Sequence, residues 1–165
     1  AADQVVGEAR EVNLYRYIEE VMSTLFAEMK RHQVQYRFSG DQDICITTIP
    51  GAFAQVLTNL VTNSIRHGFE HKNAGVISIH LERVTAGGVK LTYQDDGHGM
   101  SQEVQNNIYE PFFTTKRNKG GTGLGMNIVY NIINKNLVGE IIIKSAPERG
   151  VTFIITLPAR VPAPE

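Results

Sequence analysis

The strongest constraint on the fold is the change of hydrophobic period along the chain. Apolar residues recur every three or four positions in three stretches, 15–31, 50–66 and 121–136, which is the period of an amphipathic helix. Between and after these stretches, short runs alternate between apolar and polar residues, as half-buried strands do. No βαβ unit is repeated. We therefore expect an α+β fold, a two-layer α/β sandwich in which about three helices cover one face of a mixed, largely antiparallel sheet.

Turn residues set the limits of these elements. Pro50 suits the first turn of the second helix and Gly68 its end. Gly87-Gly88 separates two alternating runs and predicts a hairpin. A short helix is expected at Gln102–Tyr109, inside a long polar stretch between Gly97 and Gly121 that is typical of a lid. The expected strands are Val12–Leu14, Val34–Phe38, Ile44–Ile49, Val76–Val84, Val89–Asp95, Ile141–Lys144 and Val151–Leu157.

The periodic positions also predict the core. Cys45, the only cysteine, alternates with Ile44 and Ile46, and we expect it to be a buried thiol rather than a nucleophile. The inward residues expected on the first two helices are Ile18, Val21, Met22, Leu25, Phe26, Met29, Phe53, Val56, Leu57, Leu60, Val61 and Ile65.

Length and charge narrow the class of protein. A chain of 165 residues with 42% hydrophobic and 20% charged residues fits one soluble domain. The formal net charge of −1 gives no basic field for nucleic acid, and no apolar run is long enough for a membrane helix. We expect residues 1–11 to be the tail of a preceding linker or helical module, 12–158 to be the domain, and 159–165 to be a C-terminal tail. The polar start, which lacks a signal peptide, and the Pro-rich end suggest that the natural protein is longer.

Glycines gather in one region and suggest a phosphate site. Six of the 15 glycines lie between Gly97 and Gly125, and four of them precede the third helix in the segment 120–125. Glycine lets backbone N–H groups approach phosphate, and a helix N-terminus adds partial positive charge. The segment is neither a P-loop, because no Gly-Lys-Ser/Thr follows, nor a dinucleotide fingerprint, because no strand leads into it. A plain Gly-rich turn explains it equally well.

Two asparagines on the second helix are candidates for a metal site. Asn59 and Asn63 lie four residues apart and so share a helix face, and an Asn carbonyl oxygen is a fair ligand for Mg²⁺. Arg66 and His67 follow one turn later and could meet the same polyphosphate. A solvent-facing polar helix face accounts for the spacing equally well.

Two further segments carry polar or aromatic groups suited to a nucleotide. Asp95 ends a strand and is followed by Gly97 and Gly99, so a carboxylate could bind an exocyclic amine while the chain turns over a flat ring; a solvated turn is the simpler alternative. The segment 110–116 places two adjacent phenylalanines in a polar lid beside Lys116, where hinge packing is as good an explanation as ligand contact.

Taken together, residues from about Val12 to Leu157 resemble the catalytic, ATP-binding domain of bacterial two-component sensor histidine kinases. This domain belongs to the superfamily of gyrase, heat-shock chaperone, histidine kinase and mismatch-repair ATPases, which has the Bergerat-type sandwich with an ATP lid. The similar segments, in family order, are the N box at 59–67, the first glycine box at 95–100, the F box at 111–116, the second glycine box at 121–126 and the closing glycine and strand at 149–153.

The resemblance implies roles at the metal and phosphate end. Asn63 matches the Mg²⁺ ligand, and Asn59 supports that site. Arg66 and Lys116 match basic phosphate contacts; with the two asparagines they form the expected catalytic set, and His67 is the polar residue beside them. The second glycine box supplies the lid hinge and backbone contacts through Gly121, Thr122, Gly123, Leu124 and Gly125.

At the adenine end, the resemblance implies that Asp95 accepts a hydrogen bond from the adenine amino group. Gly97, Gly99 and Met100 lie around the base. Phe112 contributes from the F box, and Thr152 matches a threonine often found close to adenine. The expected cofactors are therefore ATP and Mg²⁺.

The same resemblance indicates phosphoryl transfer rather than ATP hydrolysis. ATP-hydrolysing relatives carry a water-activating Glu where this chain has Asn59, which is a poor general base. None of the five histidines has the setting of a phosphoacceptor, so we expect the dimerisation and acceptor domain to precede Ala1. This fragment should be monomeric and the parent a homodimer, with a response regulator as an indirect partner.

The expected location is the cytoplasm, and the sequence leaves open whether the parent is anchored in the inner membrane. The alternatives are a serine protein kinase of the anti-sigma type and a nucleotide-binding module without catalysis.

Overall fold

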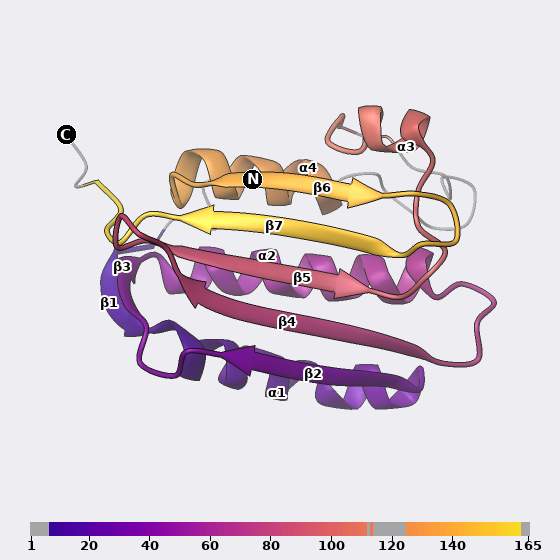
Figure 1. The fold of residues 1–165 in the computed structure, drawn as a ribbon, viewed down its shortest axis with the longest axis horizontal. Helices are drawn as coiled ribbons and strands as arrows, with labels where there is room; N and C mark the ends of the chain where they lie inside the picture. Colours follow the sequence, from indigo (N-terminus) through magenta and orange to yellow (C-terminus); the bar gives the residue numbers. More distant parts are fainter. Residues whose placement is uncertain (1–6, 112, 114–124, 163–165) are drawn as a thin grey trace.

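A sheet with strand order β2-β4-β5-β7-β6 forms one layer of the molecule, and helices cover one of its faces (Figure 1). The computed structural model describes residues 7–111, 113 and 125–162. The strands are β1 (Arg10–Asn13), β2 (Val34–Gly40), β3 (Cys45–Thr48), β4 (Gly75–Arg83), β5 (Val89–Asp95), β6 (Glu140–Ser145) and β7 (Val151–Leu157). The helices are α1 (Leu14–Arg31), α2 (Pro50–Asn63), α3 (Gln102–Asn107) and α4 (Gly125–Asn131), with π-helical extensions η2 (Ser64–Gly68) and η4 (Ile132–Asn136).

The pairing within this sheet is mixed and largely antiparallel, as expected. Strands β4, β5, β7 and β6 pair antiparallel with one another, and only β2 pairs parallel, with β4. Strand β3 lies apart in a two-stranded sheet with β1, although it follows β2 closely in the sequence. The α+β sandwich with helices α1, α2 and α4 on one face is therefore confirmed (Figure 1).

Local sequence explains where the helices begin and end. The Asn13 side chain caps α1 by accepting a hydrogen bond from the Arg16 N–H at 3.0 Å. Pro50 occupies the first turn of α2, where its missing N–H is not needed. Helix α2 passes directly into η2, so the helical path continues to Gly68, the residue expected to end it.

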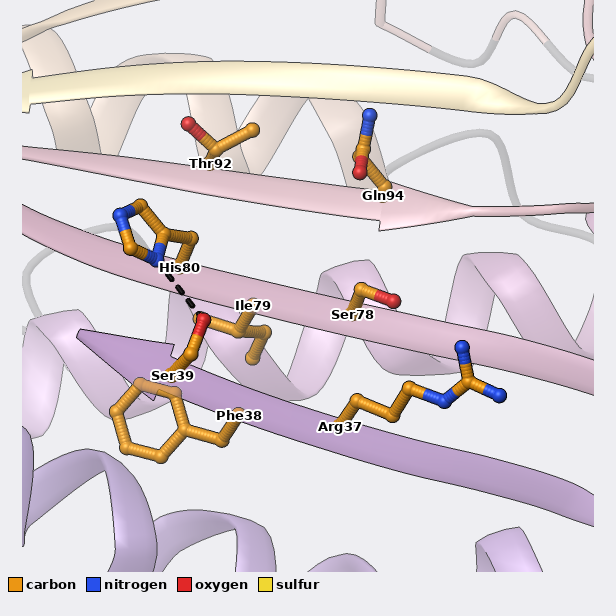
Figure 2. Close-up of a pocket in the computed structure, with 8 residues that line it drawn as sticks. All are labelled: Arg37, Phe38, Ser39, Ser78, Ile79, His80, Thr92 and Gln94. Carbon is orange, nitrogen blue, oxygen red and sulfur yellow. Dashed lines mark hydrogen bonds between the residues drawn. The ribbon is translucent and has the colours of Figure 1, made fainter.

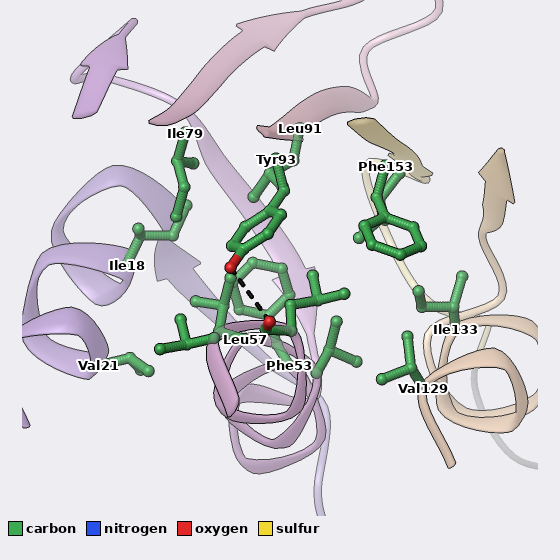
Figure 3. Close-up of a cluster of buried hydrophobic side chains, with 14 of the residues drawn as sticks. Ile18, Val21, Phe53, Leu57, Ile79, Leu91, Tyr93, Val129, Ile133 and Phe153 are labelled. Atoms are coloured by element: carbon green, nitrogen blue, oxygen red, sulfur yellow. Dashed lines mark hydrogen bonds between the residues drawn. The ribbon is translucent and has the colours of Figure 1, made fainter. Parts of the chain in front are cut away.

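The core lies between the helices and the inner face of the sheet (Figure 3). Alternate residues of β5 point inward, so Leu91 and Tyr93 pack on Phe53 and Leu57 of α2. In the described part of the chain, the buried polar side chains are Thr48, Ser64 and Asp95. Two of these three lie at one end of the core, where α2 and β5 both finish.

Two expectations about the core were wrong. Cys45 is exposed, because Ile44 and Ile46 occupy the inward positions and the two-residue period of a strand turns Cys45 outward. Phe26 is 59% exposed, because it lies roughly 90° from the centre of the buried stripe of α1 when each residue turns by about 100°.

The two-stranded sheet also holds the C-terminal segment. Thr47 forms a parallel bridge with Arg160, and the Val161 N–H donates to the Thr47 carbonyl at 2.9 Å. Val161 is buried. Among the helices of the described ranges, none is both long and apolar enough to cross a membrane.

Candidate functional site

A cavity of about 490 Å³ opens where α2, η2, the end of β5 and the start of α4 meet. We call it the α2–β5 cavity. It is lined by Asn59, Leu60, Thr62, Asn63, Ser64, Arg66, His67, Gly68, Glu70, Asp95, Gly99, Met100, Val104, Ile108, Phe113, Gly125, Met126, Ile128, Val151 and Phe153.

One wall of the cavity carries amide groups from α2. Asn59 donates from Nδ2 to the Gly125 carbonyl at 3.4 Å and accepts from Gln55 Nε2 at 3.0 Å. A Cβ added to Gly125 would lie 3.4 Å from Asn63 Oδ1, so the backbone at the start of α4 approaches this wall closely. The amide wall therefore faces the first turn of α4, where backbone N–H groups can meet an anion.

A buried carboxylate forms the opposite end of the cavity. Asp95 Oδ2 accepts a hydrogen bond from Ser64 Oγ at 2.7 Å, and Asp95 Oδ1 accepts from the Gly97 N–H at 3.0 Å. The Tyr93 hydroxyl lies 2.7 Å from Ser64 Oγ and 3.1 Å from the Leu60 carbonyl, and its single proton can serve either oxygen. These bonds hold the carboxylate in one orientation at the edge of the core.

Burial dominates the electrostatics of Asp95. Desolvation raises the pKa of its carboxyl, and the bonds from Ser64 and from backbone N–H groups only partly oppose that rise. The Tyr93 pKa is also raised, mainly by burial. A desolvated acceptor is stabilised when a ligand donates an N–H hydrogen bond to it, so Asp95 is suited to binding an amino group.

Close backbone packing explains the glycines beside Asp95. A Cβ at Gly97 would lie 2.2 Å from the Gly68 carbonyl oxygen, and one at Gly99, where φ is +73°, would lie 2.0 Å from the Ala146 carbonyl oxygen. Gly68 itself is close to the carboxylate, since a Cβ there would lie 3.0 Å from Asp95 Oδ2. Side chains at these positions would push the loop 95–100 out of place.

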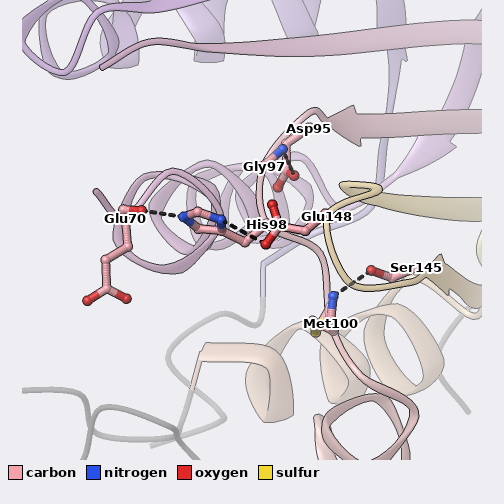
Figure 4. A network of polar contacts seen from close by, with 7 residues as sticks. All are labelled: Glu70, Asp95, Gly97, His98, Met100, Ser145 and Glu148. Carbon is pink, nitrogen blue, oxygen red and sulfur yellow. Dashed lines mark hydrogen bonds and ion pairs between the residues drawn. The ribbon is translucent and has the colours of Figure 1, made fainter. Parts of the chain in front are cut away.

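The rest of the wall is largely apolar and is anchored by polar contacts behind it (Figure 4). The Met100 N–H donates to Ser145 Oγ at 2.8 Å, and Ser145 Oγ donates to the Gly150 carbonyl at 2.7 Å. Together with Val151 and Phe153 of β7, Met100 offers an apolar surface beside Asp95. A carboxylate next to an apolar slot suits a planar heteroaromatic ring that bears an amine.

The structure brings together eight of the residues predicted from the sequence. The predicted residues that line the cavity are Asn59, Asn63, Arg66, His67, Asp95, Gly99, Met100 and Gly125. Gly97 lies directly behind it and bonds to Asp95. The predicted residues Phe112, Lys116, Gly121, Thr122, Gly123 and Leu124 lie outside the described residues.

Thr152 is the predicted residue that the structure separates from the cavity. Its Oγ1 accepts a hydrogen bond from Gln94 Nε2 at 3.2 Å on the open face of the sheet. Its neighbours Val151 and Phe153 line the cavity instead, because successive side chains of β7 point to opposite faces. The threonine matched by the resemblance is therefore displaced from the cavity by the alternation of the strand.

Sequence reasoning missed Ser64 and Tyr93. Both have a usable signal: Ser64 is a polar residue on the inward side of a helix, and Tyr93 alternates with Leu91, so its hydroxyl must find a partner in the core. The sequence does not indicate that these two side chains contact each other, because they are 29 residues apart in the chain.

A second depression, of about 410 Å³, lies on the open face of the sheet (Figure 2). We call it the open-face hollow. Ser39 Oγ lies 2.8 Å from His80 Nδ1 at one side, and Arg37 extends beside Ser78 at the other. Its lining residues are Arg37, Phe38, Ser39, Ser78, Ile79, His80, Thr92 and Gln94, none of which was predicted to belong to the site.

A metal could be held in the α2–β5 cavity only with help from a ligand. In the described ranges, no three His, Cys, Asp or Glu side chains are grouped so as to hold an ion by themselves. The amide oxygen of Asn63 is a hard ligand of the kind that Mg²⁺ accepts, and Mg²⁺ commonly takes one or two protein ligands plus phosphate and water. The residues present therefore fit a metal that arrives with a polyphosphate.

Comparison with known proteins agrees with this geometry. Residues 48–161 match the family model for histidine kinase-, DNA gyrase B- and HSP90-like ATPases. The sensor histidine kinase ZraS of Escherichia coli (strain K12) is 32% identical over 91% of this chain and 31% of its own length. Sporulation kinase A of Bacillus subtilis (strain 168) is 33% identical over 90% of this chain and 24% of its own length. The chain thus spans about a third or less of these relatives.

Solved structures give the same family. The catalytic domain of histidine kinase ThkA superposes with a TM-score of 0.80 at 31% identity, covering 93% of this chain and 97% of that domain. ThkA has also been solved in complex with the response regulator protein TrrA; that chain superposes with a TM-score of 0.75 at 28% identity and covers 92% of this chain and 42% of its own length. This chain, with its sandwich fold, belongs to the histidine kinase-, DNA gyrase B- and HSP90-like ATPase family, and within it to the histidine kinase catalytic domains.

Proposed function

We propose that this domain binds ATP with Mg²⁺ in the α2–β5 cavity and presents the γ-phosphate to a histidine on a separate dimerisation domain. The observation that carries the proposal is the meeting of Asp95 and Asn63 in one cavity, although they come from different layers of the fold. A buried acceptor at one end of the cavity suits the base of a nucleoside triphosphate, and amide oxygens at the other end suit its triphosphate with a bound metal.

At the base end, Asp95 accepts a hydrogen bond from the adenine amino group. The bonds from Ser64 and Gly97 orient the carboxylate before the ligand arrives, so little ordering is needed on binding. Gly99 and Met100 line the cavity next to Asp95 and would lie beside the ring.

At the phosphate end, Asn59, Asn63 and Arg66 face the triphosphate, with His67 beside them. The first turn of α4, beginning at Gly125, adds backbone N–H groups and the partial positive charge of a helix N-terminus. The proposed site is completed by lid residues that precede Gly125 in the sequence. These are Phe112, Lys116, Gly121, Thr122, Gly123 and Leu124. Bound Mg²⁺ would neutralise phosphate charge, with Asn63 as its protein ligand.

The domain is proposed to transfer the phosphoryl group rather than to hydrolyse ATP. Asn59 stands where a water-activating Glu would be needed, and its amide is occupied with Gln55 and the Gly125 carbonyl. An amide cannot act as a general base at neutral pH, so attack by water is slow and the γ-phosphate is kept for a protein acceptor.

The proposed partners follow from this role. The acceptor histidine lies on a dimerisation domain of the same parent protein, which is a homodimer in the cytoplasm, and a response regulator receives the phosphoryl group afterwards. The solved complex of ThkA with TrrA supports the last step, since the similarity to ThkA covers 92% of this chain. For the chain itself, residues 12–158 form the proposed catalytic unit.

The decisive experiment supplies this domain with labelled ATP and a separately expressed dimerisation domain of the parent protein. Acid-labile label on a histidine of that domain is the expected result, and Asp95→Asn in the catalytic domain should abolish most of it. Acid-stable label on serine would identify a serine kinase instead. Binding of ATP with no transfer to either residue would reduce the function to a nucleotide-binding module.

A further inference from the structure

His98 lies between two segments that build the wall of the α2–β5 cavity, although it does not line the cavity itself (Figure 4). Its ring nitrogen Nε2 contacts the backbone carbonyl of Glu70. Its other ring nitrogen, Nδ1, lies 3.5 Å from a carboxylate oxygen of Glu148 in the turn between β6 and β7. One side chain thus spans the distance from the end of η2 to that turn.

The backbone of His98 joins the same two segments. Its N–H donates to the Gly68 carbonyl at 2.8 Å, and its carbonyl accepts from the Glu148 N–H at 2.5 Å. The glycines on either side of His98 pack closely against the same two segments. A Cβ at Gly97 would clash with the Gly68 carbonyl, and one at Gly99 would clash with the Ala146 carbonyl. The ring of His98 therefore reinforces a contact that is already close.

The two partners of the ring differ in what they require. A carbonyl oxygen only accepts, so Nε2 must carry a proton for the Glu70 contact to be a hydrogen bond. Glu148 is 77% exposed and His98 is 38% exposed, so their ion pair contributes little and disappears when the ring is neutral. The Nε2–H bond to Glu70 is the contact that can hold the structure.

We propose that His98 is a positioning residue for nucleotide binding: its Nε2–H fixes the Gly68–Glu70 segment against the loop 95–100 and thereby sets the place of Asp95, Gly99 and Met100. This inference rests on the proposed function, because it assumes that the base lies against that wall. Losing the bond loosens the base end and leaves the phosphate end intact. The loss of affinity is therefore the same for ATP, ADP and adenosine, and the Mg²⁺ dependence stays unchanged.

Three variants separate the donor from the bulk of the ring. His98→Leu removes the donor, and His98→Gln keeps an amide N–H that can reach the Glu70 carbonyl. Glu148→Gln removes only the exposed ion pair. By calorimetry we expect about three- to tenfold weaker binding of all three ligands for the Leu variant, most of it regained by Gln, and less than a twofold change for Glu148→Gln. His80→Leu, on the open face of the sheet, is the matched histidine control.

A measurement on the unliganded protein tests the bond directly. Long-range ¹⁵N–¹H correlation spectra at about pH 8 should show His98 as the Nε2–H tautomer, and a Nδ1–H tautomer would overturn the proposal even if the Leu variant failed to fold. Equal losses in the Leu and Gln variants, or wild-type affinity in a folded Leu variant, would overturn it as well. If the wild-type protein bound no adenine nucleotide at all, the proposed function would fail first, while the tautomer would still report whether His98 makes its bond.

Discussion

The α2–β5 cavity and the open-face hollow have similar volumes, about 490 and 410 Å³, and both use strand β5 as a wall. Neighbouring residues of that strand serve them separately: Gln94 faces the hollow and Asp95 faces the cavity. In the cavity the polar group is a buried carboxylate held by Ser64 and Gly97. In the hollow, Arg37, Ser39, His80 and Gln94 are exposed on the open face of the sheet, where solvent can reach them.

This difference shows that volume alone does not identify a binding site. A ligand gains little binding free energy by replacing water around exposed hydroxyls. A ligand N–H that reaches a desolvated carboxylate gains more, because that carboxylate has few hydrogen bonds to water. The rigid backbone around Gly97 and Gly99 adds to this, because the cavity wall does not have to be ordered when the ligand binds.

The largest expected effect comes from Asp95→Asn paired with Gln94→Ala on the opposite face of the same strand. The substituted asparagine would present an amide in place of the ionised acceptor, so ATP and ADP affinity should fall by about 1–3 kcal/mol, or roughly 5- to 150-fold. Gln94→Ala should leave affinity unchanged. Titration calorimetry checks both, and equal effects of the two variants would remove the distinction between the cavity and the hollow.

Asn63→Ala tests the other end of the cavity. Losing its amide oxygen should remove the Mg²⁺ dependence of ATP binding, because that oxygen is the proposed protein ligand. ATP affinity is to be measured with magnesium and with a chelator. Asn134→Ala, an exposed asparagine on η4 that bonds to the Tyr130 carbonyl, is the control. A Mg²⁺ dependence that persists in the Asn63 variant would place the metal elsewhere.

Ser64→Ala tests how the buried carboxylate is held. The change leaves Asp95 Oδ2 and the Tyr93 hydroxyl without their shared partner, so the free energy of unfolding should fall by about 1–3 kcal/mol. Urea denaturation measures this free energy, and Thr62→Ala, at a nearby exposed position, is the control. An unchanged stability would mean that the network does not restrain Asp95.

A smaller effect is expected in the pH dependence of stability. Because burial raises the pKa of Asp95 above its unfolded value, its protonated form stabilises the fold at acidic pH, and this contribution is lost as pH rises through the folded pKa. Asparagine mimics the protonated form and does not titrate. From about pH 4 upward, wild-type stability should therefore decline relative to Asp95→Asn. Parallel curves from urea melts across that range would contradict a desolvated carboxylate.

The smallest effect is expected in the open-face hollow. Arg37→Ala removes its guanidinium but touches no element of the cavity, so ATP affinity should change by less than about twofold. The same calorimetric titration used for Asp95 gives the answer. A tenfold loss would show that the open face of the sheet takes part in nucleotide binding.

Much of this architecture could be predicted from the sequence, because hydrophobic period reports directly on which face of an element is buried. The period identified α1, α2 and the hairpin β4–β5, and the order of the glycine and asparagine segments located most of the cavity. It failed where a residue lies at the margin of a pattern. Phe26 at the edge of the α1 stripe and Cys45 between two buried isoleucines were both assigned inward and face outward.

The remainder depended on contacts between distant parts of the chain. The parallel pairing of β2 with β4 joins residues separated by a helix and another strand, and no local signal encodes it. The bond between Ser64 and Tyr93 and the outward turn of Thr152 likewise follow from how α2, β5 and β7 stack. The facing of Tyr93 and Thr152 is a matter of register, and a shift of a single residue would turn each side chain to the other face of the sheet.

The outward-facing Cys45 has a practical consequence. It is the only cysteine of the chain, and it lies on β3, at the opposite end of the molecule from the tip of β5 (Figure 1). A maleimide dye would therefore attach once per molecule without any mutation. Such a label leaves the nucleotide end untouched, so fluorescence anisotropy could follow docking of the acceptor domain on the native sequence.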